Sequence, residues 1–230
     1  MSRMKEWVML PTGWIRDGGL KPLRWRSGTG SGNTAALMNL VGIAHVIDEQ
    51  GSAKITYDAL CLATGLSRAK VSEGLSVLEA LNLIDRAPQG RSTFKLVGFN
   101  PKEGWGKLPA RNLYSDGVIA AFSDFRLRSV AELNALKMFL LIVAFRDNDT
   151  NHAHLSYDKF EELAGIDRGR IRSALSVLTY TGLVHTVRLA SRSNKFAVSH
   201  AYRLAGIDSH RHSGTTGRSD AFADFLADTR

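Results

Sequence analysis

The side chains of this chain with the clearest chemical potential are arginines, lysines and serines in two matching parts of the sequence. A guanidinium group can donate two parallel hydrogen bonds to a phosphate or to the edge of a guanine base, and an ammonium group supplies a compact charge. Hydroxyls beside them can add hydrogen bonds to the same acceptors. The candidate polyanion-binding residues are Arg24, Arg26, Ser67, Arg68, Lys70, Ser72, Arg86, Arg91, Lys95, Arg126, Arg128, Arg168, Arg170, Arg172, Ser173, Arg188, Arg192 and Lys195.

Two histidines offer a different chemistry. His152 and His154 could hold a divalent metal beside a tyrosine nucleophile, Tyr157 or Tyr180. The pair resembles the metal motif of rolling-circle nicking nucleases. Tyr157, however, has a counterpart in a repeated part of the sequence, Tyr57, with no histidine near it, so packing explains both tyrosines. We therefore expect no catalytic residue, no metal, no cofactor and no enzymatic activity.

The glycine-rich run Ser27 to Thr34, SGTGSGNT, raises the question of a phosphate-binding loop. It lacks the Gly-Lys-Ser/Thr ending of a P-loop, and its glycine spacing misses the dinucleotide-binding fingerprint. We therefore expect a flexible loop, followed by a helix that Asn33 or Thr34 caps and that ends near Ile47.

A sequence unit that occurs twice positions most of the candidate residues. The stretch 55–86 returns without a gap one hundred positions later as 155–186. Tyr57, Gly65 and Arg68 are among the residues that recur unchanged. A repeat of this kind indicates duplication of one supersecondary unit, so the fold has to be inferred from that unit.

Each copy of the unit predicts the same series of elements. A short β-prone run precedes a short helical pattern that ends at Gly65 or Gly165, where glycine can enter the left-handed conformation cheaply. Ser67 or Asp167 can then cap a longer helix with its apolar residues on one stripe. Two strand-like runs around a basic loop follow, and these complete the unit.

This order of elements resembles the winged helix, over about residues 33–97 and 129–204. The resemblance implies an α+β, mainly helical fold with two tandem winged helix-turn-helix domains related by internal duplication. We expect a leader and a first domain at 1–100, a leader and a second domain at 101–207, and a disordered tail at 208–230.

In a winged helix, the second helix of the helix-turn-helix enters the major groove and the wing contacts the DNA backbone. The second copy carries Arg172 where the first has Ser72, so we expect the second copy to be the main reader. Glu73 and Asp167 are acids on the same faces, where each could accept a hydrogen bond from cytosine, cap the helix or pair with an arginine. The alternative is that the arginines are solvated side chains of ordinary amphipathic helices.

The duplication extends upstream of these units. Trp7–Pro11 has a counterpart in Trp105–Pro109, and Arg24-Trp25-Arg26 recurs as Arg126-Leu127-Arg128. Arginines that flank an apolar anchor could present guanidinium groups to phosphate or to a minor groove. A strand with basic outward side chains is the alternative.

A long apolar helix is predicted at 130–145. Ser129 and Glu132 form a capping box at its start. Because apolar residues surround much of its circumference, we expect it to be buried between the two domains or in a homodimer interface.

Composition agrees with a polyanionic partner. The 230 residues carry a net charge of +8 with an isoelectric point of about 9.8, and nucleic acid is the commonest partner of such a chain. There is no apolar run that could span a bilayer and no signal-peptide pattern, so we expect no membrane partner. The one cysteine, Cys61, allows no disulfide framework. We expect a cytoplasmic, bacterial protein associated with a nucleoid or plasmid.

Two winged helices in one basic chain resemble the replication initiators of iteron-carrying plasmids. The resemblance implies sequence-specific binding of double-stranded DNA, for replication initiation or its control, with a possible homodimer and no small-molecule substrate. One alternative is a transcription regulator of the same architecture. Another is an adaptor like the tandem winged-helix subunits of chromosome-condensing complexes, which tend to be acidic.

Overall fold

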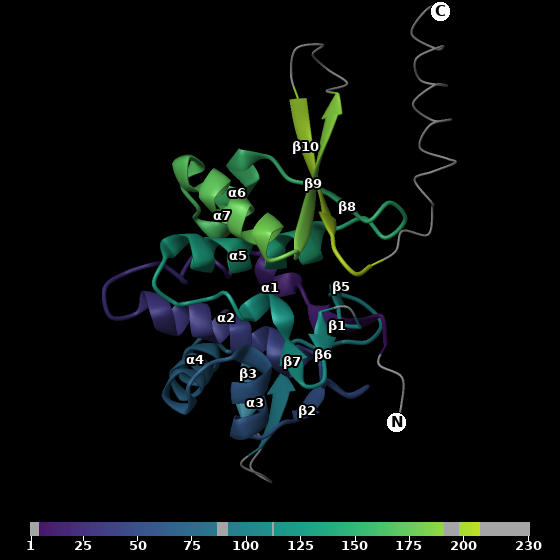
Figure 1. Ribbon diagram of the computed structural model, residues 1–230. Coiled ribbons are helices and arrows are strands. Elements are labelled where there is room, and N and C mark those ends of the chain that lie inside the picture. The colour runs from purple at the N-terminus through teal and green to yellow at the C-terminus, as the bar shows by residue number, and fades with distance from the viewer. Residues whose placement is uncertain (1–4, 87–91, 112, 191–197, 208–230) are drawn as a thin grey trace, which may run out of the picture.

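The computed structural model describes residues 5–86, 92–111, 113–190 and 198–207, with the backbone alone described at 188–190 and 198–200. The protein is α+β, as predicted, with helices outweighing small antiparallel sheets (Figure 1). No helix in this part of the chain has the length and apolar character that a membrane span requires. The predicted tail lies outside the described residues.

The elements of the two halves begin at matching positions. The first half contains β1 (Trp7–Pro11), α1 (Gly13–Arg16), α2 (Gly30–Ala44), β2 (Ser52–Lys54), α3 (Tyr57–Thr64), α4 (Arg68–Ala80), β3 (Ile84–Arg86) and β4 (Thr93–Leu96). The second half contains β5 (Trp105–Pro109), β6 (Tyr114–Ser115), β7 (Val118–Ile119), the 3-10 helix η1 (Ala120–Phe122), α5 (Val130–Phe145), β8 (His152–His154), α6 (Tyr157–Ala164), α7 (Arg168–Tyr180), β9 (Val184–Ala190) and β10 (Val198–Leu204). The pairs α2/α5, β2/β8, α3/α6, α4/α7 and β3/β9 each start one hundred residues apart, so the sequence repeat corresponds to matching elements.

In each half two short helices meet at a glycine in the left-handed conformation. Gly65 has φ of 70° after α3, and Gly165 has φ of 62° after α6, as the sequence predicts. The Ser67 hydroxyl caps α4 by accepting from the Lys70 amide at 3.3 Å. The prediction that the Asp167 side chain caps α7 is wrong, because its carboxylate instead lies 3.4 Å from Nε of Arg170.

Three strands follow the same order in both halves. The first sheet runs β2-β4-β3 and the second β8-β10-β9, with antiparallel pairing throughout. The last two strands of each sheet form the hairpin that the sequence predicts after the second helix. The two hairpins point to opposite ends of the molecule (Figure 1).

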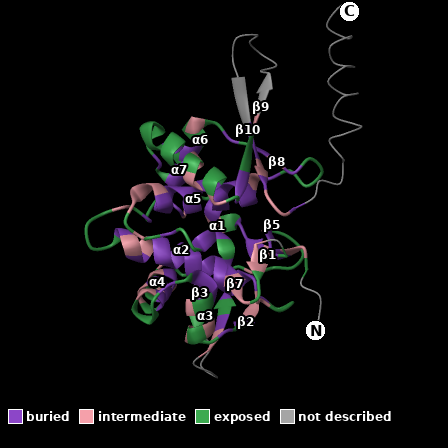
Figure 2. Ribbon diagram, viewed as in Figure 1, coloured by how far each residue is buried: buried purple, intermediate pink, exposed green. Residues whose placement is uncertain are grey.

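The core is built around four stacked helices in the order α4-α2-α5-α7 (Figure 1). Helix α5 occupies the predicted range and has the predicted capping box of Ser129 and Glu132. Helices α2 and α5 are almost wholly buried at the centre (Figure 2). Since α5 packs on α2 from the other half, its burial between the halves, one of the two predicted locations, is confirmed within a single chain.

The prediction of a flexible glycine-rich loop is wrong from Gly30 onward, because α2 begins at that residue. The glycines permit close packing. A Cβ atom on Gly30 would lie 2.6 Å from the Trp25 ring, and one on Gly32 would lie 2.2 Å from the Glu73 carboxylate. On the facing helix, a Cβ atom on Gly74 would lie 2.7 Å from the backbone of Ala35.

The two leaders pair with each other. Strand β1 is antiparallel to its equivalent β5, with Trp7 opposite Pro109, Met9 opposite Lys107 and Pro11 opposite Trp105. Because Met9 and Lys107 are themselves equivalent positions, a local twofold axis passes through this pair.

Beyond the strands, each leader crosses to the other half. Helix α1 packs on α5, and β7 packs on α3. The Lys137 ammonium of α5 donates to the Leu23 carbonyl at 2.9 Å, and burial lowers the pKa of this lysine to about 8. Part of each leader therefore packs on the other half.

Candidate nucleic-acid interface

The first cation of each candidate reading helix is held by an acid from the helix before it. Arg68 of α4 bonds the carboxylate of Asp58 and lies 5.4 Å from the Tyr57 ring centroid. Arg168 of α7 bonds Asp158 in the same way. All four charged side chains are more than 60% exposed. Ion pairs this exposed contribute about 0–1 kcal/mol, so DNA phosphates can compete for both arginines.

The next cation of α4 points into the protein. The Lys70 ammonium donates to the Ser31 hydroxyl at 2.8 Å and pairs with Glu73, and both charged side chains are half-buried. The absence of side chains at Gly32 and Gly74 brings α4 close enough to α2 for these bonds. Of the predicted reading residues of α4, Lys70 is therefore engaged in holding the fold, whereas Ser72 is exposed.

Helix α7 presents more unpaired positive charge than α4. Arg170 is exposed beside Asp167, at 3.4 Å. Arg172 is exposed, and among the described residues no carboxylate oxygen lies within 4.0 Å of its guanidinium group. The Ser173 hydroxyl, also exposed, donates to the Arg170 carbonyl at 2.8 Å. Together with its cap residues, α4 contains two basic and two acidic side chains. Together with its cap residues, α7 contains three arginines and one aspartate.

The predicted hairpin cations are only partly within the described structure. Arg86 on β3 is exposed and lies 2.7 Å from Glu79 and 3.3 Å from the Tyr57 hydroxyl. Lys95 is exposed on β4. Arg188 lies on the described backbone of β9. Arg91, Arg192 and Lys195 lie outside the described residues.

The leader arginines flank an apolar anchor, as one of the two interpretations of these segments predicts. Arg24, Arg26, Arg126 and Arg128 are all exposed, in segments that are not strands, so the strand alternative is wrong. Between each pair an apolar side chain, Trp25 or Leu127, packs against the core.

The second pair of leader arginines is also fixed through its backbone. One carboxylate, that of the buried Glu132, accepts from the amides of Arg126 at 2.6 Å and Arg128 at 3.0 Å. Position 32, the equivalent in the first half, is glycine, and the Glu73 carboxylate of α4 approaches it instead.

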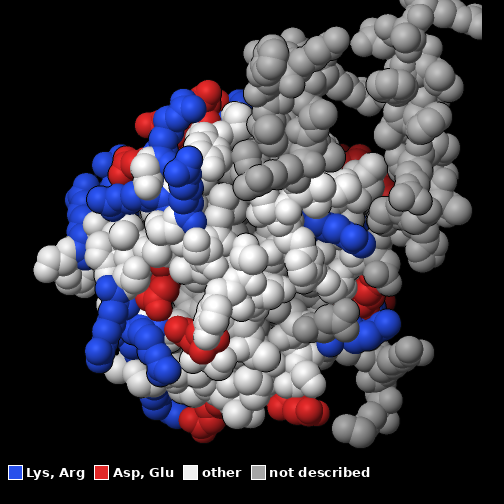
Figure 3. All heavy atoms as spheres, turned by 45° about the horizontal axis from the view of Figure 1, so that its top comes forward, with Lys and Arg blue, Asp and Glu red and all other residues white. Residues whose placement is uncertain are grey.

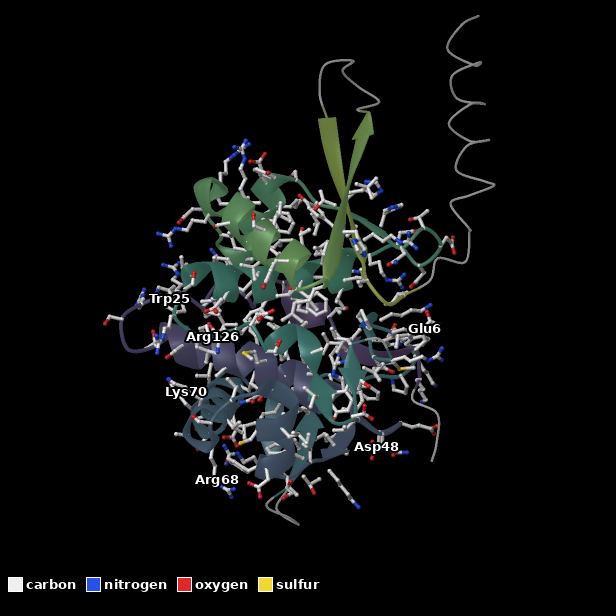
Figure 4. All side chains as sticks on the ribbon, in the orientation of Figure 1. Glu6, Trp25, Asp48, Arg68, Lys70 and Arg126 are labelled. Atoms are coloured by element: carbon white, nitrogen blue, oxygen red, sulfur yellow. The ribbon has the colours of Figure 1, made fainter. Side chains whose placement is uncertain are left out.

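These cations gather on one side of the molecule. Figure 3 shows lysine and arginine side chains along one edge, with acidic side chains among them. In Figure 4, Trp25, Arg126, Lys70 and Arg68 lie along this edge, while Asp48 lies on the opposite side. We call the edge that carries α7, the leader arginines and α4 the basic edge.

The histidine pair lies away from the reading helices. His152 and His154 sit on β8 with ring centroids 6.3 Å apart, and His152 is paired with Arg203 of β10. Burial, together with His154 and Arg203, lowers the pKa of His152. Within the described ranges, no three histidine, cysteine or acidic side chains come together in a way that could hold a metal ion.

Sequence reasoning missed the acids that pair with the first arginine of each candidate reading helix. Asp58 lies ten positions before Arg68, and Asp158 lies ten positions before Arg168. This repeated spacing is the sequence signal for the two ion pairs. The bond from Lys70 to Ser31 joins parts of the chain 39 residues apart, and no local pattern signals it.

The chain was also compared with known proteins. A scan against protein-family models and a search of curated proteins find no match.

Proposed function

We propose that this protein binds double-stranded DNA sequence-specifically through two tandem winged-helix domains, with α4 and α7 as reading helices. A protein of this kind acts without catalysis, as a replication initiator or replication control protein. The order of elements in each half, helix, strand, helix, glycine turn, helix and hairpin, supports the winged-helix assignment.

The observation that carries the proposal is the position of Arg172. This guanidinium group is exposed, lacks a carboxylate partner among the described residues, and projects from the second helix of a helix-turn-helix. A free arginine there can make the bidentate contact to guanine that discriminates by about 1–3 kcal/mol. Arg168, Arg170 and the leader arginines on the same edge supply contacts to phosphate.

Helix α7 is the stronger reader. Its equivalent α4 has no arginine at position 72, and its Lys70 is bonded to Ser31 and Glu73. Two unequal readers suit a protein in which one helix supplies most of the sequence discrimination and the other mainly adds affinity.

The test is fluorescence anisotropy of the full chain on duplex fragments from its own locus, titrated with salt against random duplex. The proposal expects one fragment to resist competition, with a log-log salt slope of several times about −0.9, the contribution of each neutralised phosphate. Binding that is absent, or that every fragment loses equally at moderate salt, would overturn the proposal in favour of a protein-binding adaptor. Localisation of the preferred fragment at an origin or at an operator separates replication from transcription control.

A further inference from the structure

The local twofold axis extends from the paired leaders into the helices. The Arg16 guanidinium of the first leader lies 4.6 Å from the Phe145 ring centroid. Its equivalent, Tyr114, packs on His45 with the ring centroids 5.1 Å apart and the ring planes tilted by 36°. Phe145 and His45 are themselves equivalent, one hundred positions apart.

Backbone hydrogen bonds between the two leaders follow the same twofold relation. The Thr12 amide donates to the Gly104 carbonyl at 2.9 Å, and the equivalent Ala110 amide donates to the Glu6 carbonyl at 2.8 Å. The strand pair and the crossing leaders therefore share one local twofold relation. The helix order α4-α2-α5-α7 has the same symmetry, with α4 and α7 as the equivalent outer helices.

The helix stack sets the separation between the reading helices. Neighbouring packed helices lie about 8–10 Å apart. Three such steps lead from α4 through α2 and α5 to α7, so the outer axes are at most about 24–30 Å apart. Successive major grooves on one face of DNA repeat at about 34–36 Å. The two helices can reach both grooves if the duplex curves modestly toward the protein.

The leader arginines lie between the two reading helices on the basic edge. Trp25 and Arg126, one from each leader, both lie along this edge in Figure 4, above Lys70 of α4. On the face of a duplex that presents two major grooves one turn apart, the groove between them is the minor groove. A narrow, A·T-rich minor groove attracts inserted arginines, and curvature toward the protein narrows it further.

We infer that one chain binds an inverted repeat whose dyad coincides with the local twofold axis of the protein, and that the leader arginines occupy an A·T-rich minor groove at its centre. The inference rests on the proposed function. The two half-sites are unequal, because α7 presents Arg172 where α4 presents Ser72. The half-site under α7 therefore has the stricter guanine requirement.

Selection of binding sites by the full chain from a random duplex pool, followed by hydroxyl-radical footprinting, tests this inference. The expected motif has two inverted half-sites with centres about 10 bp apart, an A·T-rich centre, and protection of the central minor groove. A direct repeat or a single half-site would overturn the inference and leave the proposed function intact. A pool in which no sequence is enriched would overturn both.

Two variants test the role of the leaders. The double variant Arg126→Ala, Arg128→Ala should keep both half-sites but lose the preference for A·T at the centre. The exposed Lys102→Ala, in the segment before β5, serves as a control for the loss of a surface cation elsewhere and should leave the motif unchanged. An unchanged central preference in the double variant would contradict placement of these arginines in the minor groove.

Discussion

Trp7 stacks on Trp105, with ring centroids 5.5 Å apart and an angle of 12° between the ring planes. These tryptophans are equivalent residues of the two leaders, and the stack joins the halves next to the local twofold axis. Stacked aromatic pairs contribute about 0.5–1.5 kcal/mol beyond the area they bury.

A double-mutant cycle measures this link. Trp7→Ala and Trp105→Ala should show a coupling of about 0.5–1.5 kcal/mol in the free energy of unfolding, determined by urea denaturation. Trp7→Ala combined with Trp25→Ala should be additive, because Trp25 packs near the start of α2. Additivity in both cycles would show that the tryptophan stack does not hold the halves together.

The close approach of α4 to α2 depends on Gly74. A Cβ atom there would lie 2.7 Å from Nδ2 of Asn39 and 2.8 Å from the Ala36 amide nitrogen. Gly74→Ala should lower the free energy of unfolding by about 1–3 kcal/mol, the usual cost of overpacking. Gly169→Ala on α7, where nothing lies within 4 Å of the added atom, should be neutral or stabilise by up to about 1 kcal/mol. Equal stability of the two variants would refute this account of the interface.

Glu73 forms an ion pair with Lys70, which would otherwise be free to contact DNA. Glu73→Gln removes the charged partner of Lys70 and should raise affinity for random duplex a few-fold, steepening the salt slope by up to about 0.9. Glu49→Gln, beside Asp48 on the side away from the basic edge, removes the same charge elsewhere and serves as the control. Anisotropy at low salt distinguishes them. Matching affinities would mean that Lys70 does not contact DNA when released.

His45 makes stability depend on pH. Burial lowers its pKa to about 4, and its Nε2 lies 2.8 Å from the Pro109 carbonyl oxygen. The unfolded state, with a pKa near 6.5, takes up the proton first, so stability present above about pH 6.5 is lost as the pH falls toward 4. At pH 4.5 this amounts to a loss on the order of 2 kcal/mol relative to pH 7.

His45→Phe, which copies Phe145 of the second half, should remove this part of the pH dependence. At pH 7 the variant should lose about 1–3 kcal/mol, because the Pro109 carbonyl is left without a donor. Urea midpoints at pH 7 and pH 4.5 check both effects. If the variant and the natural chain lose equal stability between these pH values, another group is responsible.

The sequence predicts the local structure of each repeat well and the packing between repeats poorly. Helix 130–145, the glycine turns and the hairpins all have local signals, such as the capping box of Ser129 and Glu132. The loop prediction is wrong at Gly30 and Gly32 because glycine favours loops in isolation, whereas here each glycine allows another side chain to pack against α2. The sequence signal for a helix start at Gly30 is the repeat itself, because the helix predicted in the second half starts at the equivalent position, Val130.

No local sequence pattern indicates that part of each leader packs on the other half. Duplication indicates that two units are similar, but it does not indicate on which unit a leader packs. The contacts of Arg16 with Phe145 and of Tyr114 with His45 join residues far apart in the chain. The same holds for the candidate site: the cations could be named from the sequence, whereas the restraint on Lys70 and the freedom of Arg172 depend on packing.

The central claim is that α7 contributes more than α4 to sequence-specific binding of duplex DNA. The most direct measurement compares the affinities of Arg172→Glu and Arg68→Glu for the preferred fragment by fluorescence anisotropy. Both variants change the charge equally, and circular dichroism checks their folding. Arg172→Glu should weaken binding by about tenfold to a hundredfold, the value of one lost bidentate contact. Arg68→Glu should weaken it less, since Arg68 already shares its charge with Asp58. Equal losses would contradict the leading role of α7, and binding unchanged in both would contradict DNA reading by these helices.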